Sequence, residues 1–129
     1  MEEVAKAEII YGSLRSRDLR CPRCHEELTC RACGCRTRYA EKMTDVKIAV
    51  QLLKDAVDSL FDRAYLVSRD ADLAPAIRAA LDRSNKSQIF VLLPPGMSRD
   101  EEFANVERDY LGRALCERLS SKQTDEIPR

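Results

Sequence analysis

The stretch AYLVSRDADLAP, residues 64–75, opens with a short apolar run and then places two aspartates, Asp70 and Asp72, where that run stops. A short apolar run that ends in polar residues predicts a buried strand, here over residues 63–68. Residues 73–84 predict a helix in which Pro75 lies in the first turn, where proline is tolerated. A strand followed at once by a helix is the basic unit of an α/β fold.

The same alternation continues on both sides of this stretch. Residues 7–14 predict a buried strand, and residues 87–96 predict another that ends at two prolines and a glycine. Residues 41–61 predict the clearest helix, because apolar side chains recur there at spacings of three and four. Those side chains are Met43, Val46, Val50, Leu53, Val57 and Leu60, with Ala49, Leu52 and Ala56 widening the stripe that we expect to face the core.

The C-terminal part predicts less regular structure. After the prolines comes a polar stretch, then a short strand near 109–111 and a helix over about 113–120, followed by a polar tail. Cys116 lies on the apolar face of that predicted helix and is expected to be a small core residue. No internal repeat is found, and 129 residues suit one domain, so residues 1–129 are expected to form a single domain.

Strands that alternate with amphipathic helices predict an open parallel sheet with helices on both faces. In such sheets ligands bind at the carboxyl ends of the strands, where each following helix also begins. Asp70 and Asp72 end a strand at that edge. Asp45, in the first turn of the 41–61 helix, lies on the same line as Ala49 and Leu52 and is carried to the same edge. Three aspartates are therefore expected to converge.

These aspartates have two interpretations. Aspartate is a favoured helix N-cap, so capping alone could explain one or two of them. If all three converge, each pair of like charges about 4 Å apart costs roughly 4 kcal/mol at an effective dielectric of 20, and a cation would relieve that cost. Clustered carboxylates suit Mg²⁺ or Mn²⁺, and either ion can activate water against a phosphodiester.

Residues 15–39 have no apolar periodicity and hold five of the six cysteines. Cys21 and Cys24 form one Cys-x2-Cys pair, and Cys30 and Cys33 form a second after five residues. This spacing predicts a structural Zn²⁺ bound by the four thiolates, with Cys35 as an alternative to Cys33 and with His25 facing solvent. Metal binding would explain how a loop without a core becomes ordered. The alternatives are a redox dithiol and unligated surface thiols.

Composition narrows the function classes further. Lys plus Arg equals Asp plus Glu at 22 each, so the chain has no overall positive charge that would indicate binding to a nucleic acid or a membrane. No apolar stretch approaches the roughly 18 residues that span a bilayer, and the acidic N-terminus MEEVAKAEII is unlike a signal peptide. A soluble, cytoplasmic protein is expected. There is no Gly-rich phosphate loop and no Ser-His-Asp pattern, since the one histidine lies among the cysteines.

Residues 41–83 resemble the NYN domain, a branch of the PIN-like ribonucleases related to the LabA-like proteins. The first motif of that family, Glu-Lys-x-x-Asp-Val, is matched by EKMTDV at 41–46, and the second, Ser-Gly-Asp-x-Asp, by SRDAD at 68–72. The resemblance extends through IFVLLPPG towards the end of the chain. It implies a PIN-like open parallel sheet flanked by helices, in which Asp45, Asp70 and Asp72 bind divalent metal and hydrolyse RNA.

The sequence departs from the family pattern at two places. Arg69 stands where glycine is usual, so it either crowds the turn or places a cation beside a phosphate of the substrate together with Ser68. The family also begins with a strand that ends in another catalytic aspartate, and no such strand precedes residue 7. The chain is then a fragment, a short form completed by a partner, or a domain that has lost catalysis.

Two function classes follow. The first is a ribonuclease that depends on Mg²⁺ or Mn²⁺ at the three aspartates, with a zinc-stapled loop and RNA as substrate. The second is a catalytically inactive module that uses the same fold to bind RNA or a protein. In either case an unpaired sheet edge favours a homodimer or a partner chain that completes the sheet. Arginines that could contact RNA phosphates are Arg36, Arg38, Arg69 and Arg99.

Overall fold

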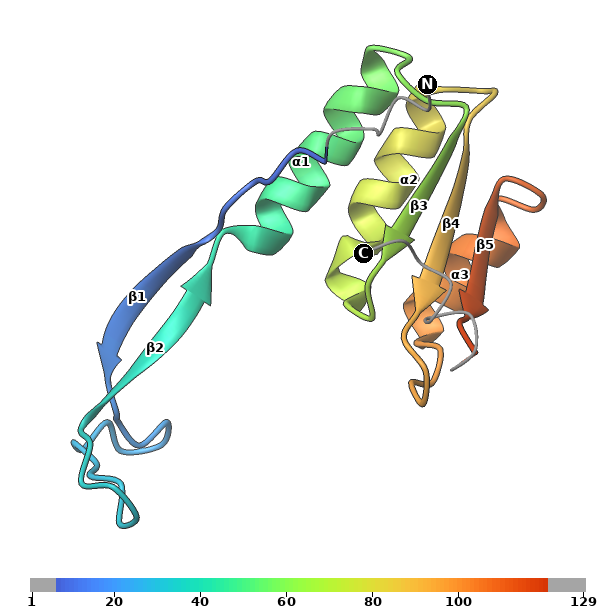
Figure 1. The fold of residues 1–129 in the computed structure, drawn as a ribbon. Coiled ribbons are helices and arrows are strands. Elements are labelled where there is room, and N and C mark those ends of the chain that lie inside the picture. The colour runs from blue at the N-terminus through green and yellow to red at the C-terminus, as the bar shows by residue number, and fades with distance from the viewer. Residues whose placement is uncertain (1–6, 121–129) are drawn as a thin grey trace, which may run out of the picture. The chain divides into compact units, whose positions relative to one another are not determined.

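The computed structural model describes residues 7–120 (Figure 1). This part of the chain belongs to two compact units, one up to Lys47 and the other from Ile48 onwards. The stretch that resembles the NYN family, residues 41–83, lies on both sides of this boundary.

The N-terminal unit is built on a two-stranded antiparallel ribbon. Strand β1, Ser13–Asp18, pairs with strand β2, Thr37–Lys42, in a register that runs from Ser13 opposite Lys42 to Asp18 opposite Thr37. The prediction of a buried strand over 7–14 is wrong, because the strand begins only at Ser13 and Ile9 is 70% exposed. An isolated ribbon has no second layer against which apolar side chains could pack.

The C-terminal unit contains a parallel sheet of three strands in the order β3-β4-β5. These strands are β3 (Arg63–Val67), β4 (Gln88–Leu93) and β5 (Ala114–Arg118). The helices are α1 (Thr44–Val57), which begins in the N-terminal unit, then the one-turn helix η1 (Ala71–Leu73), α2 (Ala74–Arg83) and α3 (Glu101–Asp109). The prediction of a mixed α/β fold with a parallel sheet flanked by helices is confirmed.

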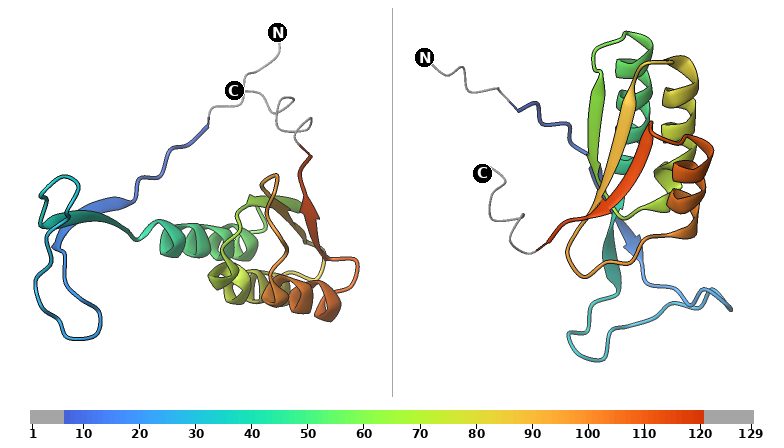
Figure 2. Two further views of the ribbon diagram at one scale, coloured as in Figure 1. Left: turned by 90° about the horizontal axis from the view of Figure 1, so that it is seen from below. Right: turned by 90° about the vertical axis from the view of Figure 1, so that its right-hand side faces the viewer.

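The helices of this unit cover one face of the sheet, not both (Figure 2). The connections from β3 to β4 and from β4 to β5 both move in the same direction across the sheet. Right-handed crossovers that move in one direction place their helices on the same face of the sheet. The prediction of helices on both faces is therefore wrong for the described residues. Helices on both faces would require the strand order to reverse within the sheet.

The core lies between this helical layer and the sheet. Its largest fully buried side chains are Leu73, Ile77, Leu81, Ile89 and Phe103. Helix α1 contributes Ala56, which is 2% exposed, and the half-buried Leu52 packs beside it. The predicted stripe is therefore only partly right. Ala49, Leu52, Leu53 and Ala56 are buried or half-buried, whereas its other members are exposed: Met43, Val46, Val50, Val57 and Leu60.

The segment after β4 differs from its prediction in both elements. The polar stretch forms α3, which Asp100 caps by accepting the backbone N–H of Glu102 at 2.9 Å and which buries Phe103 and Val106. The predicted strand at 109–111 and helix at 113–120 are wrong, because residues 114–118 form strand β5 beside β4. Cys116 is accordingly on a strand, although it packs against the core as expected.

No helix of the C-terminal unit covers the second face of the sheet (Figure 2). Tyr65 and Val67 of β3 are 62% and 59% exposed there, and the Tyr65 ring stacks on Phe90 of β4 with centroids 5.2 Å apart. Within residues 7–120, β3 has a strand partner only on its β4 side. This combination of an apolar face and an open edge is a surface suited to pairing with another chain.

No described helix is long and apolar enough to cross a membrane.

Candidate active site and thiol cluster

The turn that follows β3 brings two of the three predicted aspartates together. Ser68 Oγ accepts the backbone N–H of Asp70 at 3.0 Å, and Asp70 Oδ1 accepts the backbone N–H of Asp72 at 2.9 Å. These bonds are the local turns that Ser and Asp side chains favour, and they make Asp70 the N-cap of η1. Asp70 is half-buried and Asp72 exposed, so the turn holds two carboxylates at the carboxyl end of a parallel strand.

The helix cap uses one carboxylate oxygen of Asp70 and neither carboxylate oxygen of Asp72. One oxygen of Asp70 is occupied by the N–H bond, and its other oxygen has no hydrogen bond within the described residues. Helix α2 has no side-chain hydrogen bond at its N-cap, and a proline lies in its first turn. Both carboxylates keep oxygens that can bind a metal.

Arg69, which stands where the family has glycine, does not distort the turn. The residue does not have a positive φ, and its guanidinium lies outward, with Nη1 3.6 Å from Met97 Sδ. The backbone of Arg69 is thus ordinary for a residue with a side chain, and contact of its guanidinium with a phosphate stays a prediction. Arg99, another predicted phosphate contact, is held in an ion pair with Glu107 at 2.5 Å.

Asp45 lies in the first turn of α1, where an acid suits the helix dipole. The start of this helix is fixed by Glu41, whose carboxylate accepts both the backbone N–H of Thr44 at 2.9 Å and the Thr44 hydroxyl. These bonds from Thr44 lower the pKa of Glu41. Gly12 is packed against the same junction, because a Cβ there would meet Thr44 Oγ1. The Glu-Lys-x-x-Asp motif thus sets where α1 begins.

The two Cys-x2-Cys segments form turns of the same design at the end of the ribbon. In the first, the N–H of Cys21 donates to the carbonyl of Glu26 and the N–H of His25 donates back to Cys21, each at 2.9 Å. In the second, Cys30 and Cys35 take the places of Cys21 and Glu26, at 2.9 Å, and Gly34 takes the place of His25, at 2.8 Å. His25 and Gly34 both have positive φ, +62° and +72°. The turn at 21–26 thus recurs at 30–35, which corrects the expectation that the chain has no internal repeat.

In each turn the hydrogen bonds around the first cysteine favour its thiolate form. Hydrogen bonds from the backbone N–H groups of Cys24 and Arg23, and from the Cys24 side chain, lower the pKa of Cys21. Those of Cys33 and Ala32, with the Cys33 side chain, lower the pKa of Cys30 in the same way. Hydrogen bonding to Cys33 is the main cause that raises the pKa of Cys35 to about 11. Thiolates are the metal-binding form, so Cys21 and Cys30 suit metal binding better than Cys35 does.

Three sulfurs already lie close together. The Sγ atoms of Cys30, Cys33 and Cys35 are all within 4.8 Å of one another, and those of Cys33 and Cys35 are 2.9 Å apart. Such a cluster could hold a metal ion. Sulfurs of a tetrahedral zinc site with Zn–S bonds of about 2.3 Å lie about 3.8 Å apart, so Cys33 and Cys35 are closer than two zinc ligands would be.

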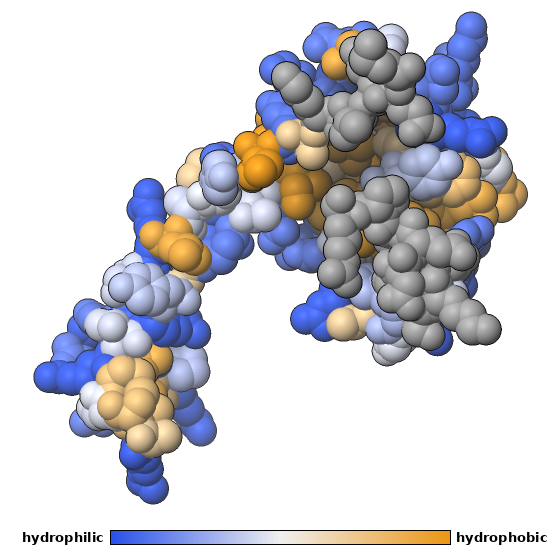
Figure 3. Space-filling model, in the orientation of Figure 1, coloured by the Kyte–Doolittle hydropathy of each residue, from blue (hydrophilic) through white to orange (hydrophobic). Residues whose placement is uncertain are grey.

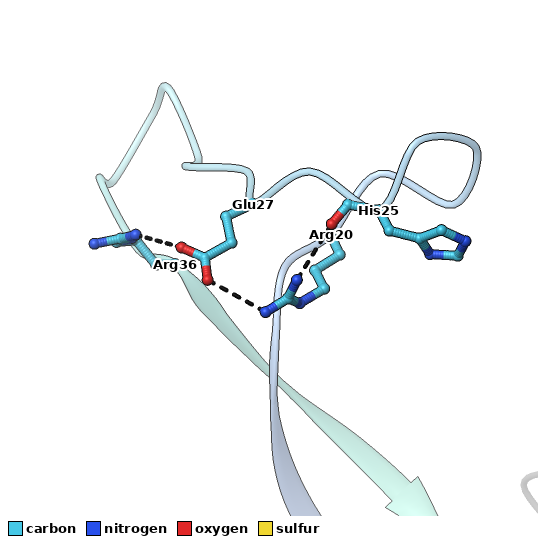
Figure 4. Close-up of polar contacts among 4 residues, drawn as sticks. All are labelled: Arg20, His25, Glu27 and Arg36. Atoms are coloured by element: carbon cyan, nitrogen blue, oxygen red, sulfur yellow. Dashed lines mark hydrogen bonds and ion pairs between the residues drawn. The ribbon is translucent and has the colours of Figure 1, made fainter.

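An ionic link ties the two turns to the ribbon. The Glu27 carboxylate accepts from Arg20 at 3.2 Å and from Arg36 at 2.7 Å, and Arg20 also donates to the backbone carbonyl of His25 at 3.3 Å (Figure 4). The His25 ring points away from this group. All these side chains are about half exposed or more, so the ion pairs add little stability. No side chain of residues 7–47 is fully buried.

Comparison with known families decides the classification of the chain. The family model described as the NYN domain matches residues 11–111, which include the ribbon, both cysteine turns and the turn after β3. The chain belongs to the NYN family. No curated protein and no solved structure matches the chain. The NYN domain is a PIN-like nuclease fold, which supports a nuclease-type function, and NYN domains are generally related to RNA.

Within this NYN domain the predicted site residues have different outcomes. Asp70, Asp72, Ser68 and Arg69 share one turn, and Cys30, Cys33 and Cys35 share one cluster. The meeting of Asp45 with the other two aspartates and the joining of the two cysteine pairs stay predictions. The sequence pattern did not reveal the ribbon, because SLRSRD at 13–18 is almost entirely polar and lacks the apolar–polar alternation of a half-buried strand.

Proposed function

We propose that this NYN domain is a ribonuclease that depends on Mg²⁺ or Mn²⁺ and uses Asp45, Asp70 and Asp72. The observation that supports it most is the turn after β3, which holds two carboxylates at the carboxyl edge of a parallel sheet in a chain of a nuclease-type family. Asp45 is assigned to the same site because it occupies the aspartate position of EKMTDV at 41–46, the stretch that resembles the first motif of the family.

The residues present fit such a metal. Carboxylate oxygens are the ligands that Mg²⁺ and Mn²⁺ prefer, and the free Asp70 oxygen together with the exposed Asp72 carboxylate supplies them. A metal held there would polarise the phosphodiester and activate water for its hydrolysis. The chain's own contribution is to fix the carboxylates: Ser68 orients the backbone of Asp70, and Asp70 in turn orients the backbone of Asp72.

Ser68 and Arg69 are assigned to the substrate. The Ser68 hydroxyl accepts one bond from Asp70 and keeps its proton to donate to a phosphate oxygen. The exposed Arg69 guanidinium, whose Nη1 lies 3.6 Å from the Met97 thioether, offers donors in the fork geometry that suits phosphate. In this role the arginine replaces the family's glycine with a substrate contact.

The test is cleavage of a fluorescent single-stranded RNA by the full chain, with Mg²⁺ or Mn²⁺ and with EDTA. We expect metal-dependent cleavage that Asp72→Asn abolishes and that Asp58→Asn, a matched change at another exposed aspartate, preserves. Metal-dependent RNA binding without cleavage would instead support the inactive binding module. Cleavage that persists in EDTA would contradict the assignment of metal.

We infer that the ribbon carries a structural Zn²⁺ bound by Cys21, Cys24, Cys30 and Cys33. The repeated turn design supports this set, because Cys35 occupies the position that Glu26 has in the first turn and is therefore the extra thiol. Residues 7–47 also have no fully buried side chain to stabilise the tip of the ribbon, and a bound zinc contributes folding free energy directly. We expect about one zinc per chain, lost in Cys30→Ser and kept in Cys35→Ser; the reverse pattern would place Cys35 in the site.

We also infer that the uncovered face and open edge of the three-stranded sheet are covered by a second copy or by a partner chain. The apolar row from Tyr65 to Phe90 and Leu115 supports this, because these neighbouring side chains lie on the face that no described helix covers. Light scattering of the full chain tests self-association, and a monomer at high concentration would leave a partner chain as the occupant.

A further inference from the structure

The β1–β2 ribbon has one strongly basic face. Residues directly opposite each other in an antiparallel pair point to the same side, and residues two apart on one strand do so as well. By this register Arg15 and Arg17 of β1 share a face with Arg38 and Lys42 of β2. All four side chains are exposed, and Figure 3 shows hydrophilic residues interspersed with apolar ones along this part of the chain.

This face contains no acid. The other two residues on it are Ser13 and Ala40, whereas Asp18 and Glu41 belong to the opposite side by the same register. Arg17 and Arg38 are direct cross-strand neighbours, and like charges in that position destabilise a ribbon. Within residues 7–120 no ion pair is formed by Arg15, Arg17 or Arg38, whereas Arg20 and Arg36 both bind Glu27. An anion would relieve the repulsion.

A hollow lies where this face meets the cysteine turns. It has a volume of about 410 Å³ and is lined by Arg17, Arg20, Arg38 and His25 as well as by Asp18. The Arg20 guanidinium is bound to Glu27, which leaves Arg17 and Arg38 as the lining arginines that can bind a phosphate. Arginine donates two parallel hydrogen bonds to phosphate oxygens. The hollow therefore extends the basic face of the ribbon into a site of the size of a nucleotide phosphate and sugar.

We propose that the basic face of the ribbon, Arg15, Arg17 and Arg38 with the adjoining hollow, binds the phosphate backbone of single-stranded RNA. Successive arginines on β1 leave the ribbon about 6.6 Å apart, which presents regularly spaced donors to a chain of phosphates. The face offers an acidic peptide no apolar pocket, since Ala40 is its one apolar side chain. Recognition is consequently independent of base sequence. The choice of RNA as partner rests on the proposed function.

The test is binding of a fluorescent single-stranded RNA to the zinc-loaded full chain in magnesium-free buffer, at several salt concentrations. The variant carries Arg15→Gln, Arg17→Gln and Arg38→Gln. The matched control carries three arginine-to-glutamine changes at exposed positions of the C-terminal unit: Arg63, Arg83 and Arg108. Zinc content and thermal melts compare the folding of the two variants with the wild type.

We expect the ribbon variant to bind at least about tenfold more weakly at 50 mM salt, while the control keeps wild-type affinity. Each phosphate contact to a single strand contributes about 0.7 to the slope of log affinity against log salt, so three lost contacts should reduce that slope by about 2. An unchanged slope, or an equal loss in the control, would overturn the proposal. So would displacement of the RNA by polyglutamate as readily as by unlabelled RNA.

The outcomes separate this inference from the ribonuclease itself. RNA binding that depends on the ribbon arginines without any cleavage in Mg²⁺ or Mn²⁺ would refute the enzyme and keep the RNA surface. Cleavage with unchanged affinity in the ribbon variant would keep the enzyme and refute the surface. A wild-type chain that binds no RNA would refute the surface.

Discussion

Replacing Asp70 by asparagine and by alanine separates a capping role from a metal-binding role at the end of β3. Asp70 Oδ1 accepts the Asp72 N–H at 2.9 Å, and this bond caps η1. Asparagine keeps an oxygen in that position but removes the charge, whereas alanine removes both. Asparagine and aspartate are similar N-caps, and loss of such a cap costs about 1 kcal/mol, within a range of about 0.5–2 kcal/mol.

We therefore expect Asp70→Ala to lower the free energy of unfolding by about 1 kcal/mol, which corresponds to about 4 °C in Tm for a chain of 129 residues. Asp70→Asn should leave that free energy unchanged or slightly raised in the apo protein, because it also removes a negative charge beside Asp72. Both variants should lose RNA cleavage, since each removes a metal ligand.

Urea unfolding followed by circular dichroism in EDTA measures the stability, and cleavage of single-stranded RNA in Mn²⁺ measures the activity. Asp58→Asn is the control for removal of an exposed carboxylate. If Asp70→Asn cleaves RNA at the wild-type rate, the carboxylate charge is not needed and the metal assignment fails. If it loses as much stability as Asp70→Ala, the 2.9 Å bond is not what caps the helix.

Three further outcomes follow. Phe103→Ala should lower the free energy of unfolding by about 3–5 kcal/mol in urea melts, because this ring is 2% exposed in the core; a loss below 1 kcal/mol would contradict that packing. In zinc-free protein at pH 8, Cys30 should react with iodoacetamide faster than Cys35, whose pKa is about 11, as peptide mass spectrometry would show; equal rates would count against the turn's effect. Val67→Lys on the uncovered sheet face should weaken any self-association seen by light scattering, and an unaffected oligomer would place its interface elsewhere.

The sheet and its acidic turn were predictable because their signals are local. Strands β3 and β4 are apolar runs with abrupt polar ends, and the helix at 74–83 is marked by Pro75 in its first turn. Asp70 and Asp72 were found because residues that end a parallel strand share one edge with the helix that follows. The spacing of the cysteines likewise indicated the two turns, since the geometry of a metal site restricts the number of residues between its ligands.

The errors arose where the pattern allowed two structures. Helix α1 carries an alanine stripe beside a valine stripe, and periodicity alone does not say which one packs inward. Residues 114–118 have helical composition, yet the open edge of β4 recruits them as a strand, so tertiary pairing overrides propensity. Helix α3 was missed because only Phe103 and Val106 mark its buried face.

The most direct test of the ribonuclease is a Mn²⁺ titration of the wild-type chain and of Asp45→Asn, with RNA cleavage measured at each concentration. The account predicts that cleavage by the wild type follows saturation of one Mn²⁺ site, and that Asp45→Asn shifts this saturation to at least tenfold higher Mn²⁺ with little cleavage. Zinc-loaded protein keeps the cysteine site from taking up manganese. Saturation and cleavage by Asp45→Asn equal to those of the wild type would show that this aspartate is not part of the site and would contradict the account.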